Sequence, residues 1–313
     1  MTGLDDARLL HQPLLAAVRR WPDKTALVCG PRHATYAQLL REVEAVAAAL
    51  RERGLQPGDR VALLLDNGVE MVAALYAVLS LGAVMVPLHP LTKAPKLARL
   101  LDDAGAAMLL TQSSLQPAWR ETLAGCACVH SCLVAGHDGP GDEPRVLPWP
   151  AATPGGPALD GGSAAEDALA ALIYTSGTTG SPKGVMLSHR NMLSAAHSVQ
   201  AYLGLREDDV ILSALPLAFS YGLYQVLIGL AVGATVVLER SFSFPARVLQ
   251  TMATHRATVF PGVPTMFAQW MGMSGLQHHA LDALRLVTSA AAPLPLAQIR
   301  WLRATFPQAR LYS

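Results

Sequence analysis

Apolar positions in the first 135 residues follow two spacings, one typical of buried strands and one typical of helices. The clearest helical stretch follows Thr35, where apolar residues recur every three or four positions until Gly54. Thr35 and Gln38 have the spacing of a capping box, which satisfies the first free amides of a helix. We therefore expect a helix between about Tyr36 and Arg53.

The segments that follow this helix repeat a strand, helix, strand order. DRVALLLDN, VMVPL and AMLLTQ have the short apolar runs of buried strands, whereas GVEMVAALYAVLSLGA and KAPKLARLLDDAGA have helical spacing. Repeated β-α-β units of this length predict a parallel sheet with helices on both faces. The fold class is therefore predicted to be α/β.

The composition changes between residues 136 and 167, where Gly, Pro and Ala dominate, as in a loop or linker. Strands are then predicted for ALAALIYT, GVMLS, DVILSALPL, ATVVLE, ATVFPGVP and LRLVTSA. Helices are predicted after a cap near Ser188 and at Leu223–Val232, Thr265–Met271 and Leu296–Thr305. We expect two α/β lobes, residues 1–135 and 168–313, joined by the segment 136–167.

One apolar stretch is long enough to cross a bilayer. Val210 to Leu238 contains no charged residue and no histidine. Pro216 and three glycines divide it into pieces of strand and helix length, so we expect a buried core instead. The amino terminus lacks the pattern of a secretory signal, and the net charge of +1 does not favour nucleic-acid binding. These features predict a cytoplasmic protein without a transmembrane segment or nucleic-acid partner.

Cys126, Cys128, His130 and Cys132 form the one cluster with a composition typical of metal ligands. Their strict alternation is the spacing of a strand, in which neighbours on one face lie about 6.6 Å apart. Zinc ligands must come closer together than an extended segment allows. We therefore expect no metal site and interpret the cysteines as partly buried free thiols.

The segment from Thr175 to Gly184 combines glycines, hydroxyl side chains and Lys183 between two apolar runs. Glycines let backbone amides approach a ligand closely, while hydroxyls and an ammonium group suit phosphate oxygens. The spacing differs from a Walker A loop, because Lys183 is followed by Gly184 rather than Ser or Thr. The alternative is a solvated turn, which explains Gly and Pro but not the density of hydroxyls.

The stretch YTSGTTGSPKGVMLSHRN resembles the signature loop of the adenylate-forming superfamily, which includes acyl- and aryl-CoA synthetases. LPLAFSYGL, GVPTMF and TSAAAPLP resemble later motifs of this superfamily in order and spacing. The resemblance extends over essentially the whole chain. It implies the layered α/β/α lobes of the large amino-terminal domain in this superfamily.

The resemblance also implies an activity, in which a carboxylate attacks the α-phosphorus of ATP and the acyl group then passes to a thiol. ATP, Mg²⁺ and coenzyme A are the implied cofactors, and a carrier-protein thiol is an alternative acceptor. Catalytic roles are implied for Lys183 and Thr175. The motif match implies phosphate contacts by Thr175, Ser176, Gly177, Thr178, Thr179, Gly180 and Lys183.

Several residues in the second half are implied to line the acyl pocket, namely Phe219, Tyr221, Gly222, Val263, Pro264 and Thr265. Phe219 replaces a histidine that many members of the superfamily place beside the carboxylate. Peptide-synthetase domains usually place an Asp where this chain has Ser220, so an amino-acid substrate is disfavoured. An apolar acyl or aryl acid fits better, while core packing is the alternative role for Phe219 and Tyr221.

The adenine side of the nucleotide site is implied to contain Ala290, Ala291 and Pro293. Two alanines replace the commoner Gly-Gly pair, so each methyl group is expected to crowd the base. His189, Arg190 and Asn191 follow the loop and are expected to cap a helix or contact solvent.

The sequence ends at RATFPQARLYS, before the Tyr-Gly-x-Thr-Glu motif and the carboxy-terminal lid domain of the superfamily. We therefore expect an acid–thiol ligase that is truncated and cannot complete adenylation by itself. The alternative is a non-catalytic nucleotide- or acyl-binding module or scaffold that keeps the fold.

Overall fold

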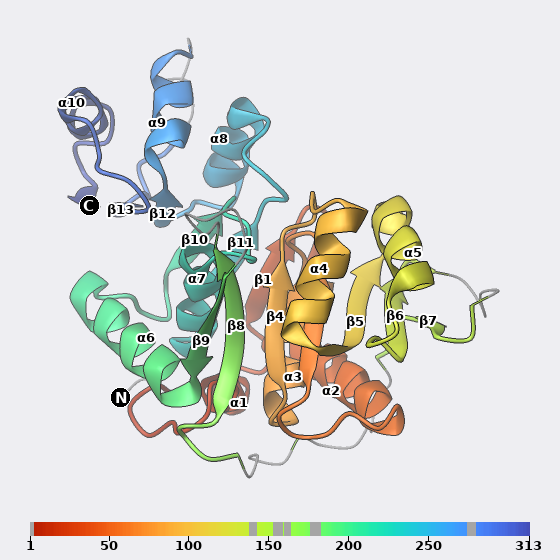
Figure 1. The fold of residues 1–313 in the computed structure, drawn as a ribbon. Coiled ribbons are helices and arrows are strands. Elements are labelled where there is room, and N and C mark those ends of the chain that lie inside the picture. The colour runs from red at the N-terminus through yellow and green to blue at the C-terminus, as the bar shows by residue number, and fades with distance from the viewer. Residues whose placement is uncertain (1–2, 138–142, 153–158, 160–163, 176–182, 274–279) are drawn as a thin grey trace.

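The chain folds into two mostly parallel sheets with helices on both faces of each, as the sequence predicts (Figure 1). The structure is a computed structural model and describes residues 3–137, 143–152, 159, 164–175, 183–273 and 280–313. The α/β fold class is confirmed.

The elements of the first half alternate as the apolar spacing predicts. Their bounds are α1 Gln12–Arg20, β1 Thr25–Cys29, β2 Arg32–Thr35, α2 Tyr36–Glu52, β3 Arg60–Leu64, α3 Val69–Ser80, β4 Val84–Leu88, α4 Ala94–Ala104, β5 Ala106–Gln112, the 3₁₀ turn η1 Ser113–Leu115, α5 Gln116–Gly125, β6 Ser131–Ala135 and β7 Val146–Pro148. The capping box of Thr35 and Gln38 is confirmed, because Thr35 Oγ1 accepts from the Gln38 amide and Gln38 Oε1 accepts from the Thr35 amide.

The second half continues the alternation. Its elements are β8 Leu169–Thr175, β9 Lys183–Ser188, α6 His189–Leu203, β10 Val210–Ser213, α7 Ser220–Ala231, β11 Thr235–Leu238, α8 Pro245–Thr254, β12 Val259–Gly262, α9 Pro264–Met271, β13 Leu286–Ser289, α10 Leu296–Thr305 and β14 Arg310–Tyr312. The uncharged stretch Val210–Leu238 is thus divided into β10, α7 and β11 rather than forming one long helix. Within the described ranges, no helix is both long and apolar enough to cross a membrane.

The two sheets interleave along the sequence. Sheet A has the strand order β14-β13-β12-β10-β11-β1-β2, and sheet B has the order β7-β6-β5-β3-β4-β8-β9. Only the edge pairs β1–β2 and β8–β9 are antiparallel among the described strands. The expected lobes 1–135 and 168–313 therefore do not correspond to the sheets, because β1 pairs with β11 and β8 pairs with β4.

The Gly- and Pro-rich segment expected to be a loop contains one short strand. Residues Val146–Pro148 form β7, which pairs in parallel with β6 at the edge of sheet B. An edge position tolerates proline, because one side of the strand needs no ladder hydrogen bonds.

The largest apolar core lies between the sheets and contains side chains from both of them. Nearly every residue of α3 is buried there, together with the apolar faces of α2 and α7. The outer face of sheet A is covered by α8, α9 and α10, and the outer face of sheet B by α4 and α5 (Figure 1). Helices and sheets therefore alternate in layers, with sites available where the parallel strands end.

Candidate active site

The two ends of the signature loop are held opposite one another at the tip of sheet B. Thr175 ends β8 and Lys183 begins β9, and the two residues are direct partners in the antiparallel pair. Both side chains are exposed. The predicted phosphate residues Ser176, Gly177, Thr178, Thr179 and Gly180 lie outside the described residues. The structure thus gives the positions of the two residues between which the signature loop lies.

Tyr174 anchors the end of β8 to a neighbouring helix. Its hydroxyl donates a hydrogen bond to Asp103 in α4, and burial followed by this carboxylate raises the pKa of the phenol. A β-carbon at Gly184 would lie 3.3 Å from the Tyr174 ring, so glycine permits the close approach of β9. The loop therefore begins from a fixed strand pair.

A pocket of about 530 Å³, here called the α7–β13 pocket, opens between α6, α7 and the ends of β13 and β14. Its lining includes two of the predicted adenine-side residues, Ala290 and Ala291, together with Ser289 and four tyrosines, namely Tyr202, Tyr221, Tyr224 and Tyr312. The predicted residue Pro293 is exposed and does not line this pocket. Tyr221, predicted to line the acyl pocket, therefore lies in the same pocket as Ala290 and Ala291, which were predicted on the adenine side.

Tyr221 is fixed at the floor of the pocket by Thr288. Their hydroxyl oxygens lie 2.7 Å apart, and burial raises the pKa of Tyr221 to about 12. The phenol is therefore neutral at physiological pH. The core-packing alternative describes this residue incompletely, since its ring is half-buried and lines the pocket.

The turn after β13 has two unusual features. Ala291 has a φ of 74°, a left-handed conformation that favours glycine. The Ser289 hydroxyl is buried and has no hydrogen-bond partner among the described residues. A buried polar atom without a partner is costly, so a ligand that bonds to this hydroxyl would gain free energy. Ser289 was not among the residues singled out from the sequence.

Phe219 lies outside the α7–β13 pocket and is about half exposed, at 49%. Core packing, the alternative considered for this residue, is therefore wrong. Its ring instead lies 5.7 Å from the ring of His89, measured between centroids. His89 follows β4 and lines a second pocket of about 530 Å³, here called the His89 pocket. Only the VPLHP run, with a histidine directly after a buried strand, signals this residue in the sequence.

The remaining predicted substrate residues do not share one cavity. Thr265 lines the His89 pocket, whereas Val263 and Pro264 form the start of α9 and Val263 packs against the outer core of sheet A. A β-carbon at Gly222 would lie 2.4 Å from the Pro216 carbonyl oxygen. Backbone packing alone therefore requires glycine at position 222.

The residues after the loop have structural contacts. Ser188 and Asn191 form the capping box of α6, which confirms the expected helix cap. Arg190 pairs with Asp167 at 2.8 Å. His189 is completely buried, and burial followed by the charge of His11 lowers its pKa to about 4.

Magnesium coordination usually needs carboxylate ligands. The described residues that line the α7–β13 pocket include no Asp or Glu side chain. These residues alone therefore do not fit Mg²⁺, and no catalytic step is assigned to the ion.

Comparison with known proteins gives the family. Residues 14–313 match the AMP-binding enzyme family. The 4-coumarate–CoA ligase 5 of Oryza sativa subsp. japonica is 33% identical over 307 residues, which covers 93% of this chain and 54% of that ligase. The chain spans about half the length of the curated relatives it matches.

Solved structures agree in fold. The anthranilate CoA ligase AuaEII in complex with anthranoyl-AMP aligns with a TM-score of 0.87 and 25% identity, over 100% of this chain and 61% of that chain. The inhibitor-bound N-terminal domain of FACL13 from Mycobacterium tuberculosis aligns with a TM-score of 0.84 and 26% identity, over 97% of this chain and 74% of that chain. This chain therefore belongs to the AMP-binding enzyme family and has the fold of the amino-terminal domain of adenylate-forming enzymes.

Proposed function

We propose that this chain is part of an ATP-dependent ligase that converts a carboxylic acid to an acyl-adenylate and passes the acyl group to a thiol. Coenzyme A is the proposed acceptor, and a carrier-protein thiol is the alternative. The observation that carries the proposal is the α7–β13 pocket, where an unpartnered buried hydroxyl of Ser289 adjoins the Ala290–Ala291 turn. The anthranoyl-AMP in the AuaEII complex supports an adenylate as the ligand of such a fold.

Thr175 and Lys183 are proposed to act on the phosphates, together with Ser176, Gly177, Thr178, Thr179 and Gly180. Thr175 and Lys183 lie opposite one another in the β8–β9 pair. A hydroxyl group and an ammonium group are therefore found at the two ends of one loop. An ammonium group next to the departing pyrophosphate stabilises the negative charge that develops there. No covalent bond to the protein is needed for this chemistry.

An aromatic or apolar acid is the proposed substrate. The α7–β13 pocket presents tyrosine rings, and its described lining includes no Asp or Glu to pair with an α-ammonium group. Tyr221 is proposed as the main contact for an aryl group, because its ring is fixed by Thr288. The coumarate and anthranilate ligases named above support this class of acid.

Many members of the superfamily place a histidine beside the substrate carboxylate, and this chain has Phe219 at that position. His89, whose ring lies next to that of Phe219, is proposed to orient the carboxylate instead. Burial, followed by the charge of Lys96, lowers the pKa of His89, so its imidazole is neutral near pH 7. His89 Nδ1 accepts a hydrogen bond from the Leu91 amide at 3.2 Å. The proton of the neutral ring therefore resides on Nε2, which can donate a hydrogen bond to a carboxylate oxygen.

The test is carboxylate-dependent exchange of labelled pyrophosphate into ATP, with aryl, fatty and amino acids compared as substrates. It should be run on this chain and on the longer gene product, if one is encoded. Exchange in the active form should fall at least about a hundredfold in Lys183→Ala, as expected for loss of transition-state charge stabilisation. The control Lys93→Ala, an exposed lysine at the start of α4, should exchange normally. No exchange with any acid by either chain would defeat the ligase proposal.

A second function is favoured by one observation: the described residues that line the α7–β13 pocket include no Asp or Glu to hold magnesium. This lining suits a module that binds a nucleotide or acyl group without turnover. Magnesium-ATP would then raise the melting temperature in a Lys183-dependent manner while exchange remains undetectable. That pair of results would select the binding module over the ligase.

A further inference from the structure

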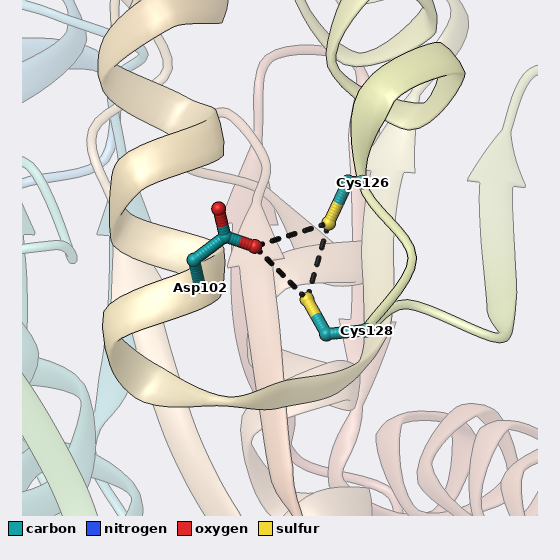
Figure 2. Close-up of side chains that lie close together, drawn as sticks. All are labelled: Asp102, Cys126 and Cys128. Carbon is teal, nitrogen blue, oxygen red and sulfur yellow. Dashed lines mark hydrogen bonds between the residues drawn. The ribbon is translucent and has the colours of Figure 1, made fainter.

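Two thiols and a carboxylate converge on the outer side of sheet B, between the end of α4 and the segment that follows α5 (Figure 2). The Sγ atoms of Cys126 and Cys128 lie 3.1 Å apart. Asp102 Oδ1 lies 3.8 Å from the first sulfur and 3.6 Å from the second. The group is found where β5 and β6 begin, whereas the candidate active site is found where β8 and β13 end.

The spacing argument against a metal site is wrong for this pair. β6 begins only at Ser131, and the chain turns between Cys126, which follows α5, and Cys128. The two side chains therefore face each other instead of lying along one strand face. Cys132 is buried in β6 and is not part of the group, and His130 is a neighbour of Ser131 Oγ at 3.4 Å.

Arg145 fixes the turn that carries the cysteines. Its guanidinium group donates hydrogen bonds to the carbonyl oxygens of Leu123 at 2.7 Å, Cys126 at 2.8 Å and Val129 at 3.2 Å. Three bonds from one rigid planar group restrict the backbone on both sides of the thiols. The ligand atoms are thus positioned in advance, as a binding site requires.

We propose that Asp102, Cys126 and Cys128 bind one thiophilic divalent cation, of which zinc is the model. Two sulfur ligands and one carboxylate oxygen suit zinc, and a water molecule would supply the fourth ligand. The cation would replace the proton of each thiol, and both protons would pass to solvent.

The distances fit such an ion without rearrangement of the backbone. A point equidistant from three atoms separated by 3.1, 3.6 and 3.8 Å lies about 2.0 Å from each of them in their plane. An ion about 1 Å above that plane would lie about 2.3 Å from both sulfurs, but tetrahedral bonds of that length hold two sulfurs about 3.8 Å apart, so the two thiol side chains must move apart by about 0.7 Å on binding. A disulfide would instead require the sulfurs to approach to about 2.05 Å.

Access favours a cation here. The carbonyl oxygens at the ends of α4 and α5 already accept hydrogen bonds from Arg60 and Arg145, so the attraction for a cation comes from the Asp102 carboxylate and from the thiolates that form on binding. Asp102 is exposed, Cys128 is half-buried and Cys126 is buried, which leaves one side open for entry.

The experiment is a cobalt titration of the full, reduced, metal-free chain. One Co²⁺ per chain should bind with the near-ultraviolet absorption of cobalt–thiolate bonds, and added Zn²⁺ should displace it. Affinity should fall at least about tenfold in Cys126→Ser and in Cys128→Ser, since even the loss of outer-shell partners has that effect. Asp102→Asn should weaken binding several-fold. Asp103→Asn, the neighbouring carboxylate that binds Tyr174 instead, is the matched control and should keep the wild-type affinity.

A second readout needs no variant. Zn²⁺ should slow alkylation of Cys126 and Cys128 in the wild-type chain but not that of the half-buried Cys29. Unchanged cobalt affinity in both serine variants, or no stoichiometric binding, would overturn the proposal. Unchanged affinity in Asp102→Asn would show that Asp102 is not a ligand and would overturn the three-ligand site. An intrachain disulfide that forms in air, without metal uptake by the reduced chain, would make the pair a redox device instead.

Discussion

The hydroxyl oxygens of Tyr221 and Thr288 lie 2.7 Å apart and join the first turn of α7 to β13. Removal of either hydroxyl leaves the other without this bond, so Tyr221→Phe and Thr288→Val should each destabilise the fold. A double-mutant cycle measured by urea unfolding should give a coupling of about 0.5–1.5 kcal/mol, the range of one buried hydrogen bond. Strictly additive effects would show that the bond does not form in solution.

Ala291 offers a test of backbone strain at the adenine-side turn. Its φ of 74° costs a non-glycine residue about 1 kcal/mol or more. Because the side chain is exposed, Ala291→Gly should lose little packing and should stabilise the fold by about 0.5–1 kcal/mol. Chemical denaturation measures the change.

Ala290→Gly is the matched control, because φ is not positive at position 290. It should lower stability by about 0.4–1 kcal/mol through the greater freedom of the unfolded chain. A loss of stability in both variants would show that position 291 is not left-handed in solution.

His189 should make stability depend on pH between about 6.5 and 4. Burial and then His11 lower its pKa in the folded state from 6.5 to about 4, so the unfolded chain binds more protons in this window. The contribution of neutral His189 to the free energy of unfolding is fully present above pH 6.5. It decreases by up to about 3 kcal/mol as pH falls to about 4. Urea unfolding at several pH values measures it.

His189→Gln should flatten this dependence on pH. His197 lies on the same helix with an exposed ring, so His197→Gln should leave the profile close to that of the wild type. An unchanged slope in His189→Gln would show that other groups cause the acid sensitivity.

Asp209 provides a contrast between a buried and an exposed ion pair. It is 1% exposed and accepts hydrogen bonds from Arg285 Nε at 2.7 Å and Thr258 Oγ1 at 2.7 Å. Although burial by itself would raise the pKa of Asp209, these bonds hold it below its usual value. Asp209→Asn should therefore cost about 1.5–3 kcal/mol, the range for hydrogen bonds to charged groups.

Asp208→Asn removes a neighbouring carboxylate that pairs with Arg206 at 2.7 Å on the exposed surface. That change should cost less than about 1 kcal/mol. Thermal or urea denaturation of both variants makes the comparison, and equal losses would contradict the importance of burial.

Local structure could be predicted from the sequence where spacing and capping agree. The capping box at Thr35, the strand Val84–Leu88 and the helix Leu296–Thr305 follow from residues close together in the chain. Strand order could not be predicted in the same way, because buried parallel strands are all short apolar runs. Nothing local in β1 specifies β11 as its neighbour, more than two hundred residues away.

The candidate site was predictable only in part for the same reason. The signature loop and Tyr221 were found through motifs, whereas His89 and Ser289 gain significance from neighbours distant in sequence. For the thiol pair, the error came from reading too much into local sequence. A local spacing rule applied to Cys126 and Cys128 assumed a strand where the chain turns.

The core between the sheets sets a limit on how this domain can move. Because α3 contributes side chains to one apolar cluster that includes strands of both sheets, a hinge between the sheets would expose many of them to water. Each large apolar side chain so exposed costs about 1.5–3 kcal/mol, more in total than the binding of a small ligand can supply. Ligand-driven rearrangement in this domain should therefore be confined to the segments that follow the strand ends, while the two sheets keep their relative positions as one rigid body.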